Sequence, residues 1–135
     1  MNIEYKETPW PHFVGSLDEE MYYHAFKLWE TDEKLKSYNI SKNRSNIEIK
    51  DEILVNYITD KGYPLRDWHL DLGNKIVTGL WYFKNVEEKD DGGHLILGNP
   101  HTGEEVPFEY GPNKVILFPN TPDSWHKITA RKPTK

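Results

Sequence analysis

The second half of the chain alternates short β-prone runs with turns, at intervals of about ten residues. β-Branched, aromatic and aliphatic residues fill four such runs, at residues 75–83, 94–97, 106–110 and 114–118. Segments rich in glycine, proline and polar residues separate them. Several short strands at this spacing are typical of a jelly roll or a similar barrel-like sandwich, so we expect a mainly β fold.

The strongest strand signal is the run at residues 75–83 (Lys-Ile-Val-Thr-Gly-Leu-Trp-Tyr-Phe). Side chains alternate between the two faces of a strand, so Thr78, Leu80 and Tyr82 are expected to share one face. The run at 114–118 contains an uninterrupted Val-Ile-Leu-Phe sequence, which predicts a strand that is buried on both of its faces.

Ahead of these strands the sequence predicts one helix. Ser16 and Glu19 fit a capping box, in which each side chain satisfies a backbone group at the helix start. Apolar residues, including Met21 and Leu28, then recur at helical spacing, so we expect a helix from about residue 17 to 36 with one face packed on the domain. The other expected segments are an extended stretch at 9–14, a loop at 37–46, strands at 47–50, 53–58 and 63–70, and an acidic loop at 85–93.

Composition limits the classes of protein to which this chain can belong. Its 135 residues are expected to form a single domain spanning 1–135. The chain has no cysteine, which excludes a disulfide framework, a thiolate zinc site and a cysteine nucleophile. A formal net charge of −5 argues against nucleic acid as the main partner. There is neither a membrane-length apolar run nor a signal-peptide pattern, so we expect no membrane partner and a cytoplasmic location.

The feature with the clearest chemistry is Trp-His-Leu-Asp at residues 68–71. In an extended strand, His69 and Asp71 leave the same face about 7 Å apart at the backbone, so both can reach one metal ion. His126, 55 residues beyond Asp71, is the candidate third ligand. Two imidazoles and a carboxylate suit Fe(II), Mn(II) or Zn(II) and leave coordination positions open. A His-x-Asp triplet alone is common by chance and more often marks a solvated turn.

The order of these segments resembles that of the Fe(II)/2-oxoglutarate-dependent oxygenases, especially the small prolyl-hydroxylase-like branch. The resemblance extends from about residue 9 to the C-terminus. Proteins of this family hold iron in a double-stranded β-helix, which is a form of the jelly roll, so the resemblance implies that fold. The matching segments, in chain order, are Pro-x-Pro-His-Phe with the following helix, His69-x-Asp71, Val77–Tyr82, Gly92–Leu95, Val115–Phe118 and Trp125-His126.

The resemblance implies that His69, Asp71 and His126 bind iron and that Tyr82 hydrogen-bonds the far carboxylate of 2-oxoglutarate. The family places an arginine or lysine about nine to eleven residues after the second histidine to pair with that carboxylate. The candidates here are Lys135, nine residues after His126, and the nearer Arg131. The closing strand is therefore expected to be short or missing. We hypothesise that a partner chain supplies it or that the sequence is cut short, and an open sheet edge of this kind favours a homodimer.

The activity that the resemblance implies is hydroxylation of a peptidyl substrate, with prolyl residues favoured, or of a small molecule. Fe(II) is the expected cofactor and 2-oxoglutarate the cosubstrate, which leaves as succinate and CO₂; ascorbate is a candidate reductant. Two other functions stay open. One is a non-catalytic jelly-roll module that binds a metal or another ligand without turnover, and the other is a metal-dependent hydrolase that uses the same three ligands.

Overall fold

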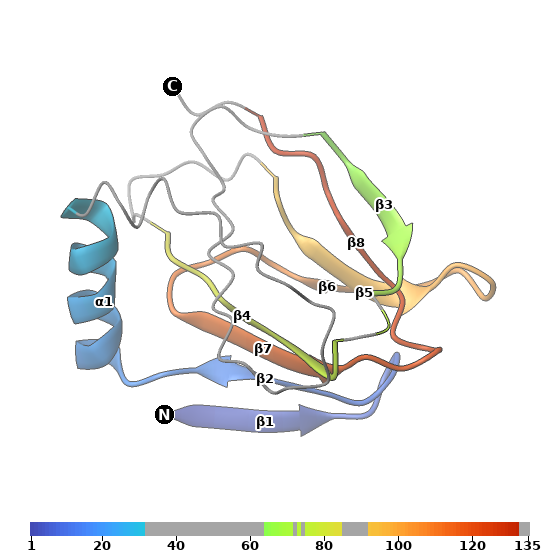
Figure 1. Cartoon of the computed structure of the whole chain (residues 1–135), viewed down its shortest axis with the longest axis horizontal. Coiled ribbons are helices and arrows are strands. Elements are labelled where there is room, and N and C mark those ends of the chain that lie inside the picture. Colours follow the sequence, from blue (N-terminus) through green and yellow to red (C-terminus); the bar gives the residue numbers. More distant parts are fainter. Residues whose placement is uncertain (32–63, 72, 74, 85–91, 133–135) are drawn as a thin grey trace.

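The computed structural model describes residues 1–31, 64–71, 73, 75–84 and 92–132. Over these residues the chain is mainly β, with one helix and two antiparallel four-stranded sheets (Figure 1). In chain order the elements are β1 (Asn2–Lys6), β2 (His12–Ser16), α1 (Glu19–Thr31), β3 (Arg66–His69), β4 (Val77–Trp81), β5 (Leu95–Asn99), β6 (Glu104–Phe108), β7 (Lys114–Pro119) and β8 (His126–Ile128).

Strands that are far apart in the sequence lie side by side in both sheets. The strand order is β1-β2-β7-β4 in the first sheet and β3-β8-β5-β6 in the second. β7 pairs with β2 on one side and β4 on the other, while β8 lies between β3 and β5. The C-terminal part of the chain therefore supplies an inner strand to each sheet.

Several strand boundaries differ from those expected. β5 continues to Asn99, which the sequence placed in a turn, because its hairpin with β6 pairs Asn99 with Glu104 and Leu95 with Phe108. The same register starts β6 two residues before the expected run at 106–110. At the N-terminus, β1 and β2 pair as an antiparallel hairpin, which the sequence reading did not predict.

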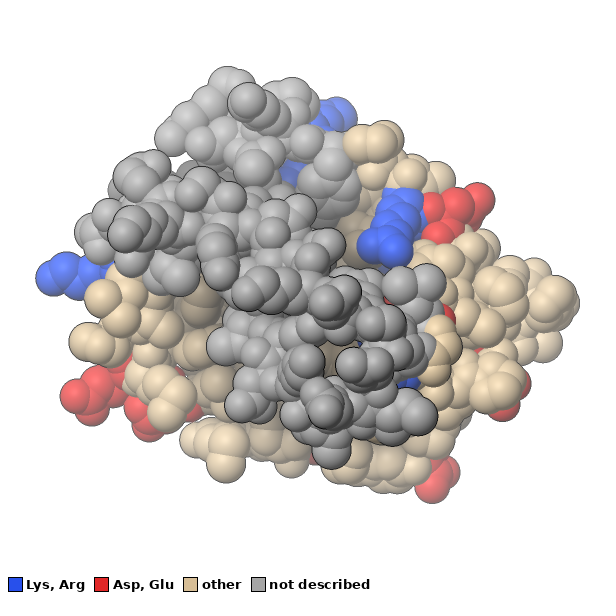
Figure 2. Space-filling view, viewed as in Figure 1, with Lys and Arg blue, Asp and Glu red and all other residues tan. Residues whose placement is uncertain are grey.

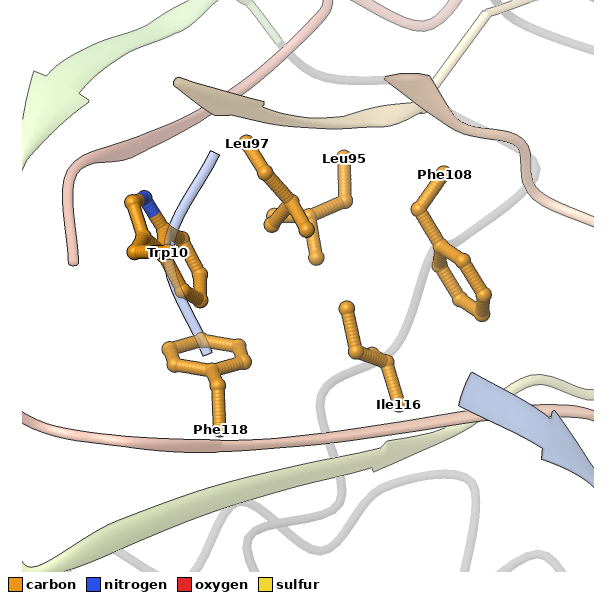
Figure 3. Packing of buried hydrophobic residues seen from close by; sticks show 6 residues of the cluster. All are labelled: Trp10, Leu95, Leu97, Phe108, Ile116 and Phe118. Carbon is orange, nitrogen blue, oxygen red and sulfur yellow. The ribbon is translucent and has the colours of Figure 1, made fainter. Parts of the chain in front are cut away.

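The core lies between the two sheets. Six side chains form its centre: Trp10, Leu95, Leu97, Phe108, Ile116 and Phe118 (Figure 3). Leu80 and Tyr82 pack against this cluster from the β4 side, on the face that strand alternation predicted. Apolar side chains from both sheets thus meet in one cluster, as expected where two sheets pack face to face.

The expectation that β7 is buried on both faces is wrong for Leu117, which is 39% exposed. Ile116 and Phe118 point into the core, but Leu117 lies on the outer face, between Phe13 of β2 and Gly79 of β4. Gly79 has no side chain, and an added Cβ there would lie 2.8 Å from Cδ2 of Leu117, which leans over it. Phe13 is itself exposed, so these two neighbours leave Leu117 uncovered.

The predicted capping box is wrong, because helix α1 begins after Asp18. The Asp18 carboxylate accepts a hydrogen bond from the backbone N–H of Met21 (3.1 Å), which makes Asp18 the N-cap. Ser16 instead remains in β2, where it pairs with Lys114 of β7. A carboxylate at this position also suits the positive end of the helix dipole.

The packing face of α1 also differs from the expected one. Tyr22 is buried, and its ring centroid lies 5.7 Å from that of Phe83 and 6.2 Å from that of Trp81. Met21 and Leu28, which were expected to face the domain, are both more than half exposed. Aromatic contacts with the β4 segment therefore set the orientation of the helix.

Asn113, in the turn between β6 and β7, connects the helix start to the sheet. Its side-chain amide donates to the carbonyl of Leu17 (2.8 Å), and its side-chain oxygen accepts from the backbone N–H of Leu17 (3.3 Å) and from Nε1 of Trp81 (3.1 Å). Its φ of 58° lies in the left-handed region, where asparagine is more acceptable than most residues. One side chain thus joins the start of α1, the end of β4 and the turn.

Within the described residues, no helix combines the length and apolar character needed to cross a membrane. On the face shown in Figure 2, the charged side chains of the described part form small separate groups of either sign. Several expected features lie outside the described residues: the end of the helix at 32–36, the loop at 37–46, the strands at 47–50 and 53–58, most of the acidic loop at 85–93, and Lys135.

Candidate metal centre

β3 and β8 bring together the three side chains that the sequence singled out. His69 ends β3, His126 begins β8, and the two residues face each other in the antiparallel register. Their ring centroids are 4.3 Å apart. Asp71 follows two residues after His69, and the ligand atoms of all three side chains lie within 4.8 Å of one another. The three donors thus converge at one point, next to the core.

Both imidazoles are oriented by main-chain carbonyl groups. Nδ1 of His69 lies 2.8 Å from the carbonyl oxygen of Asp67, and Nδ1 of His126 lies 2.9 Å from that of Ser124. A carbonyl oxygen can only accept a hydrogen bond, so each Nδ1 carries a proton and donates it. In the neutral ring, Nε2 then holds the lone pair that a metal ion needs, which is the usual arrangement of metal-binding histidines.

The two carboxylate oxygens of Asp71 have different neighbours. The side chain is only 6% exposed. Oδ2 accepts a short hydrogen bond from the hydroxyl of Thr78 in β4. Oδ1 lies 3.4 Å from Nε2 of His126 and 3.6 Å from Nζ of Lys75. Oδ1 is therefore the oxygen that is positioned to share a cation with the histidines.

The surroundings of Asp71 and His69 shift both of their pKa values downward. Burial raises the pKa of the Asp71 carboxyl, but three neighbours outweigh it. The His126 ring in its protonated form, the hydroxyl of Thr78 and the charge of Lys75 together hold the pKa well below its usual range. Burial lowers the pKa of the His69 imidazole, and His126 acts in the same direction, against the hydrogen bond to the Asp67 carbonyl. Both shifts favour the forms that bind a metal cation, an ionised carboxylate and a neutral imidazole.

The distance between Nε2 of His126 and Oδ1 of Asp71 fits two ligands of one ion. With metal–ligand bonds of roughly 2.1 Å, ligands at about 90–110° to each other lie roughly 3.0–3.4 Å apart. The observed separation is 3.4 Å. A lone pair on Nε2 facing a carboxylate at this distance is repulsive, so a proton or a metal cation between them relieves it. The donor set suits Fe(II), Mn(II) and Zn(II), and the residues therefore fit a divalent metal ion.

Comparisons with known protein families, curated protein sequences and solved structures find no match for this chain. The candidate centre is therefore defined by its donor set and its geometry. Within the part of the chain that the structure describes, His69, Asp71 and His126 form the one group of histidine and acidic side chains placed to share an ion.

One wall of the candidate centre is aromatic. The ring centroid of Phe118 lies 5.0 Å from that of His126, and the ring centroid of Trp10 lies 5.2 Å from that of Phe118. Nε1 of Trp10 donates to the carbonyl oxygens of Gly98 (3.1 Å) and Trp125 (3.2 Å). These contacts tie the segment ahead of β2 to the residue before His126 and keep this side of the ligands apolar.

Two polar side chains fix the loops that carry the ligands. The side chain of Asn120, after β7, donates to the carbonyl of Lys75 (3.1 Å), and its backbone N–H donates to that of Ile76 (3.0 Å). These bonds hold Lys75 and Ile76, directly ahead of β4. Ser124 is almost fully buried, and its hydroxyl donates to the carbonyl of Thr121 (3.0 Å) within the turn that precedes β8. Both loops are thereby held by specific hydrogen bonds.

Sequence reasoning did not identify Thr78, Lys75, Asn120 or Ser124 as parts of the site. Thr78 carried a usable signal, because strand alternation placed its hydroxyl on the inward face, and a buried hydroxyl needs a hydrogen-bond partner. Lys75 was only the polar first residue of the expected strand at 75–83, and Asn120 and Ser124 stand in turn-like sequence, where polar residues are ordinary. Only the three-dimensional arrangement shows that those residues support the ligands.

Tyr82 and Arg131, the expected partners of 2-oxoglutarate, belong to one cluster inside the sandwich. Arg131 is 3% exposed, and its guanidinium lies 5.0 Å from the ring centroid of Tyr110. The Tyr110 ring in turn lies 5.3 Å from that of Tyr82. Nη1 of Arg131 also donates to the carbonyl of Gly92 (3.2 Å). A buried positive charge is thus fixed over the ring of Tyr110, which in turn contacts Tyr82, while Lys135 lies outside the described residues.

Proposed function

We propose that this chain is an Fe(II)- and 2-oxoglutarate-dependent dioxygenase that hydroxylates a peptidyl substrate, with prolyl residues favoured, or a small molecule. The observation that carries the proposal is the convergence of His69, Asp71 and His126, whose ligand atoms lie within 4.8 Å of one another, while Nδ1 of each histidine is bound to a main-chain carbonyl. Two histidines and one carboxylate with open positions are the ligand set of non-haem Fe(II) oxygenases. Bound iron would supply the redox chemistry that couples oxidation of 2-oxoglutarate to hydroxylation.

We further propose that the sandwich is a jelly roll. Support comes from its two facing antiparallel sheets of four strands, in which most neighbours are distant in sequence. A jelly roll has eight strands in two sheets joined by such connections. In that arrangement the ligands belong to the β3-β8-β5-β6 sheet, and the core cluster closes the interior beside them.

In this proposal different residues of the chain bind the metal, bind the cosubstrate and exclude water. His69, Asp71 and His126 hold the metal on one side and leave its other positions open. Arg131 and Tyr82 bind the far carboxylate of 2-oxoglutarate, for which a buried guanidinium is a suitable partner. The aromatic wall of Trp10 and Phe118 excludes water from the side of the ligands that faces the core.

The test is succinate formation by the purified chain with Fe(II), 2-oxoglutarate and ascorbate in air. We expect succinate from the wild type and background levels from His69→Ala and Asp71→Ala, because each removes a metal ligand. His24→Ala, which changes an exposed residue of α1, should match the wild type. Succinate that is absent from the wild type, or unchanged in both ligand variants, would overturn the proposal.

A non-catalytic jelly-roll module that binds a metal or another ligand is the alternative. The expected short or missing closing strand after His126 favours it: among the described residues β8 (His126–Ile128) is the last strand, followed by an isolated bridge between Gly92 and Arg131. This function predicts metal binding without succinate. A metal-dependent hydrolase would instead act without oxygen and prefer Zn(II). The homodimer through an open sheet edge stays a prediction, and the mass in solution tests it.

A further inference from the structure

We infer that Thr78 is a positioning residue that makes Asp71 a one-oxygen ligand; this rests on the metal centre of the proposed function. The hydroxyl of Thr78 donates to Oδ2 of Asp71. The other oxygen, Oδ1, faces Nε2 of His126 at 3.4 Å. The hydrogen bond therefore engages the carboxylate oxygen other than the one that faces the histidine, and it leaves Oδ1 for a metal ion.

The position of Thr78 is fixed independently of the ligands. Thr78 belongs to β4, in the first sheet, whereas the two histidines belong to the second sheet. In the antiparallel register Thr78 pairs with Phe118 of β7, whose ring lies 5.0 Å from that of His126. A threonine side chain has few χ1 rotamers, so a fixed strand fixes the hydroxyl too. Thr78 thus holds the carboxylate from the opposite sheet.

The hydrogen bond from Thr78 can hold the Asp71 carboxylate because that side chain is buried. With only 6% of the side chain exposed, water has little access to replace a lost hydrogen bond to Oδ2. A carboxylate released from Thr78 would be free to turn and bind the ion with both oxygens. Lys75 would not replace the lost contact, because its Nζ lies 3.6 Å from Oδ1, the oxygen that Thr78 does not bind.

The number of open positions on a bound metal would depend on whether Asp71 binds it through one oxygen or through both. Three single-atom protein ligands leave three positions on an octahedral ion. In the proposed reaction 2-oxoglutarate would need two of these positions and dioxygen the third. If Asp71 bound through both oxygens, one of those positions would be lost. Thr78 therefore preserves the vacancy that the proposed reaction requires.

The experiment compares Thr78→Val, which keeps the shape and removes the hydroxyl, with Thr78→Ser, which keeps the hydroxyl. Mn(II) is the probe, and its affinity is measured by electron paramagnetic resonance titration of the full chain. The number of exchangeable waters on bound Mn(II) is measured by water-proton relaxation. We expect Thr78→Val to bind Mn(II) roughly 10- to 100-fold more weakly, as for other residues that orient metal ligands. It should also lose about one bound water, and Thr78→Ser should restore both values.

Wild-type affinity and water number in Thr78→Val would overturn the inference, as would a weakened affinity with an unchanged water number. If Thr78 had a merely structural role, Thr78→Val would lower the urea midpoint of the metal-free protein and leave the number of waters on bound Mn(II) unchanged. Should Thr78→Val not fold, Thr78→Ala carries the same two expectations. Failure of the metal centre itself looks different: the wild type would then bind Mn(II) no better than His126→Ala.

Discussion

Asp71 and His69 both have lowered pKa values in the folded chain, for different physical reasons. For Asp71, hydrogen bonds and nearby positive charge stabilise the ionised carboxylate more than burial penalises it. For His69, burial penalises the charged imidazolium, and the neighbouring His126 adds to the effect. In each case the unfolded chain takes up a proton at a higher pH than the folded chain, so acid favours unfolding.

We expect the metal-free protein to lose stability in two stages as the pH falls. The contribution of His69 is complete above a pH of about 6.5, the pKa of an unfolded histidine, and is lost as the pH falls towards its lower folded value. The contribution of Asp71 begins to be lost near a pH of about 4 and continues to fall below it. Urea midpoints measured from pH 8 to pH 3 check both stages.

Two variants separate these stages. His69→Gln should remove the first fall, and Asp71→Asn should remove the second. A first fall that persists unchanged in His69→Gln would show that another group causes it.

At the scale of elements, α1 is held to the sheet by aromatic rings on one side and by Asn113 at its start. The hydrogen bonds of Asn113 reach both backbone groups of Leu17 and the indole of Trp81. Tyr22 supplies the buried ring that meets the strand. The polar contact therefore fixes where the helix begins, and the rings fix its orientation.

Removing the Asn113 side chain should weaken the fold without touching the metal ligands. We expect Asn113→Gly, which keeps the left-handed backbone accessible, to lower the free energy of unfolding by about 2–3 kcal/mol, since three hydrogen bonds of about 1 kcal/mol each are lost. Asn113→Ala should cost about 1 kcal/mol more, because alanine is strained at a positive φ. Urea unfolding measures both values. An Asn113→Gly midpoint equal to that of the wild type would contradict this account.

The sequence could predict which segments form strands, and on which face each side chain lies, where these depend on local alternation of apolar and polar residues. Thr78, Leu80 and Tyr82 face inward as expected, because position along a strand decides the face. The start of α1 could not be predicted in this way. Ser16 and Asp18 are both good caps, and the choice between them depends on where β2 ends. The exposure of Leu117 likewise depends on which residues the neighbouring strands place beside it.

The candidate site was only partly readable from the sequence for a similar reason. The spacing of His69 and Asp71 is local, so a strand pattern could indicate that both reach one ion. Their meeting with His126 depends on the register of β3 against β8, which no local pattern specifies. The hydrogen bond from Thr78 further depends on how the two sheets face each other.

At the scale of the whole molecule, a bound ion would act as a cross-link. It would join the end of β3 to the start of β8, and through Asp71 and Thr78 it would connect the second sheet to the first. A ligand that binds only the folded state stabilises it by mass action. In the proposed function, metal binding and folding would therefore be coupled.

Saturating metal should raise the melting temperature. With free Mn(II) at 100 times its dissociation constant, the stabilisation is about 2.7 kcal/mol. For a domain of this size that corresponds to an increase of roughly 10 °C. Thermal unfolding followed by circular dichroism, with and without Mn(II) under anaerobic conditions, measures the shift. His126→Ala should show no shift, and an equal shift in that variant would place the bound metal elsewhere.

The main-chain hydrogen bonds of the two histidines bear on how the site tolerates sequence change. Asp67 and Ser124 hold the imidazoles with carbonyl oxygens, which every amino acid possesses. No single replacement at either position can delete that acceptor. The carboxylate has no such protection, because its support comes from a hydroxyl that one codon change can remove. If sequences with the proposed metal centre diverge, the orientation of the two imidazoles should therefore persist longer than that of the carboxylate, and substitution of residue 78 should be the first change to weaken metal binding.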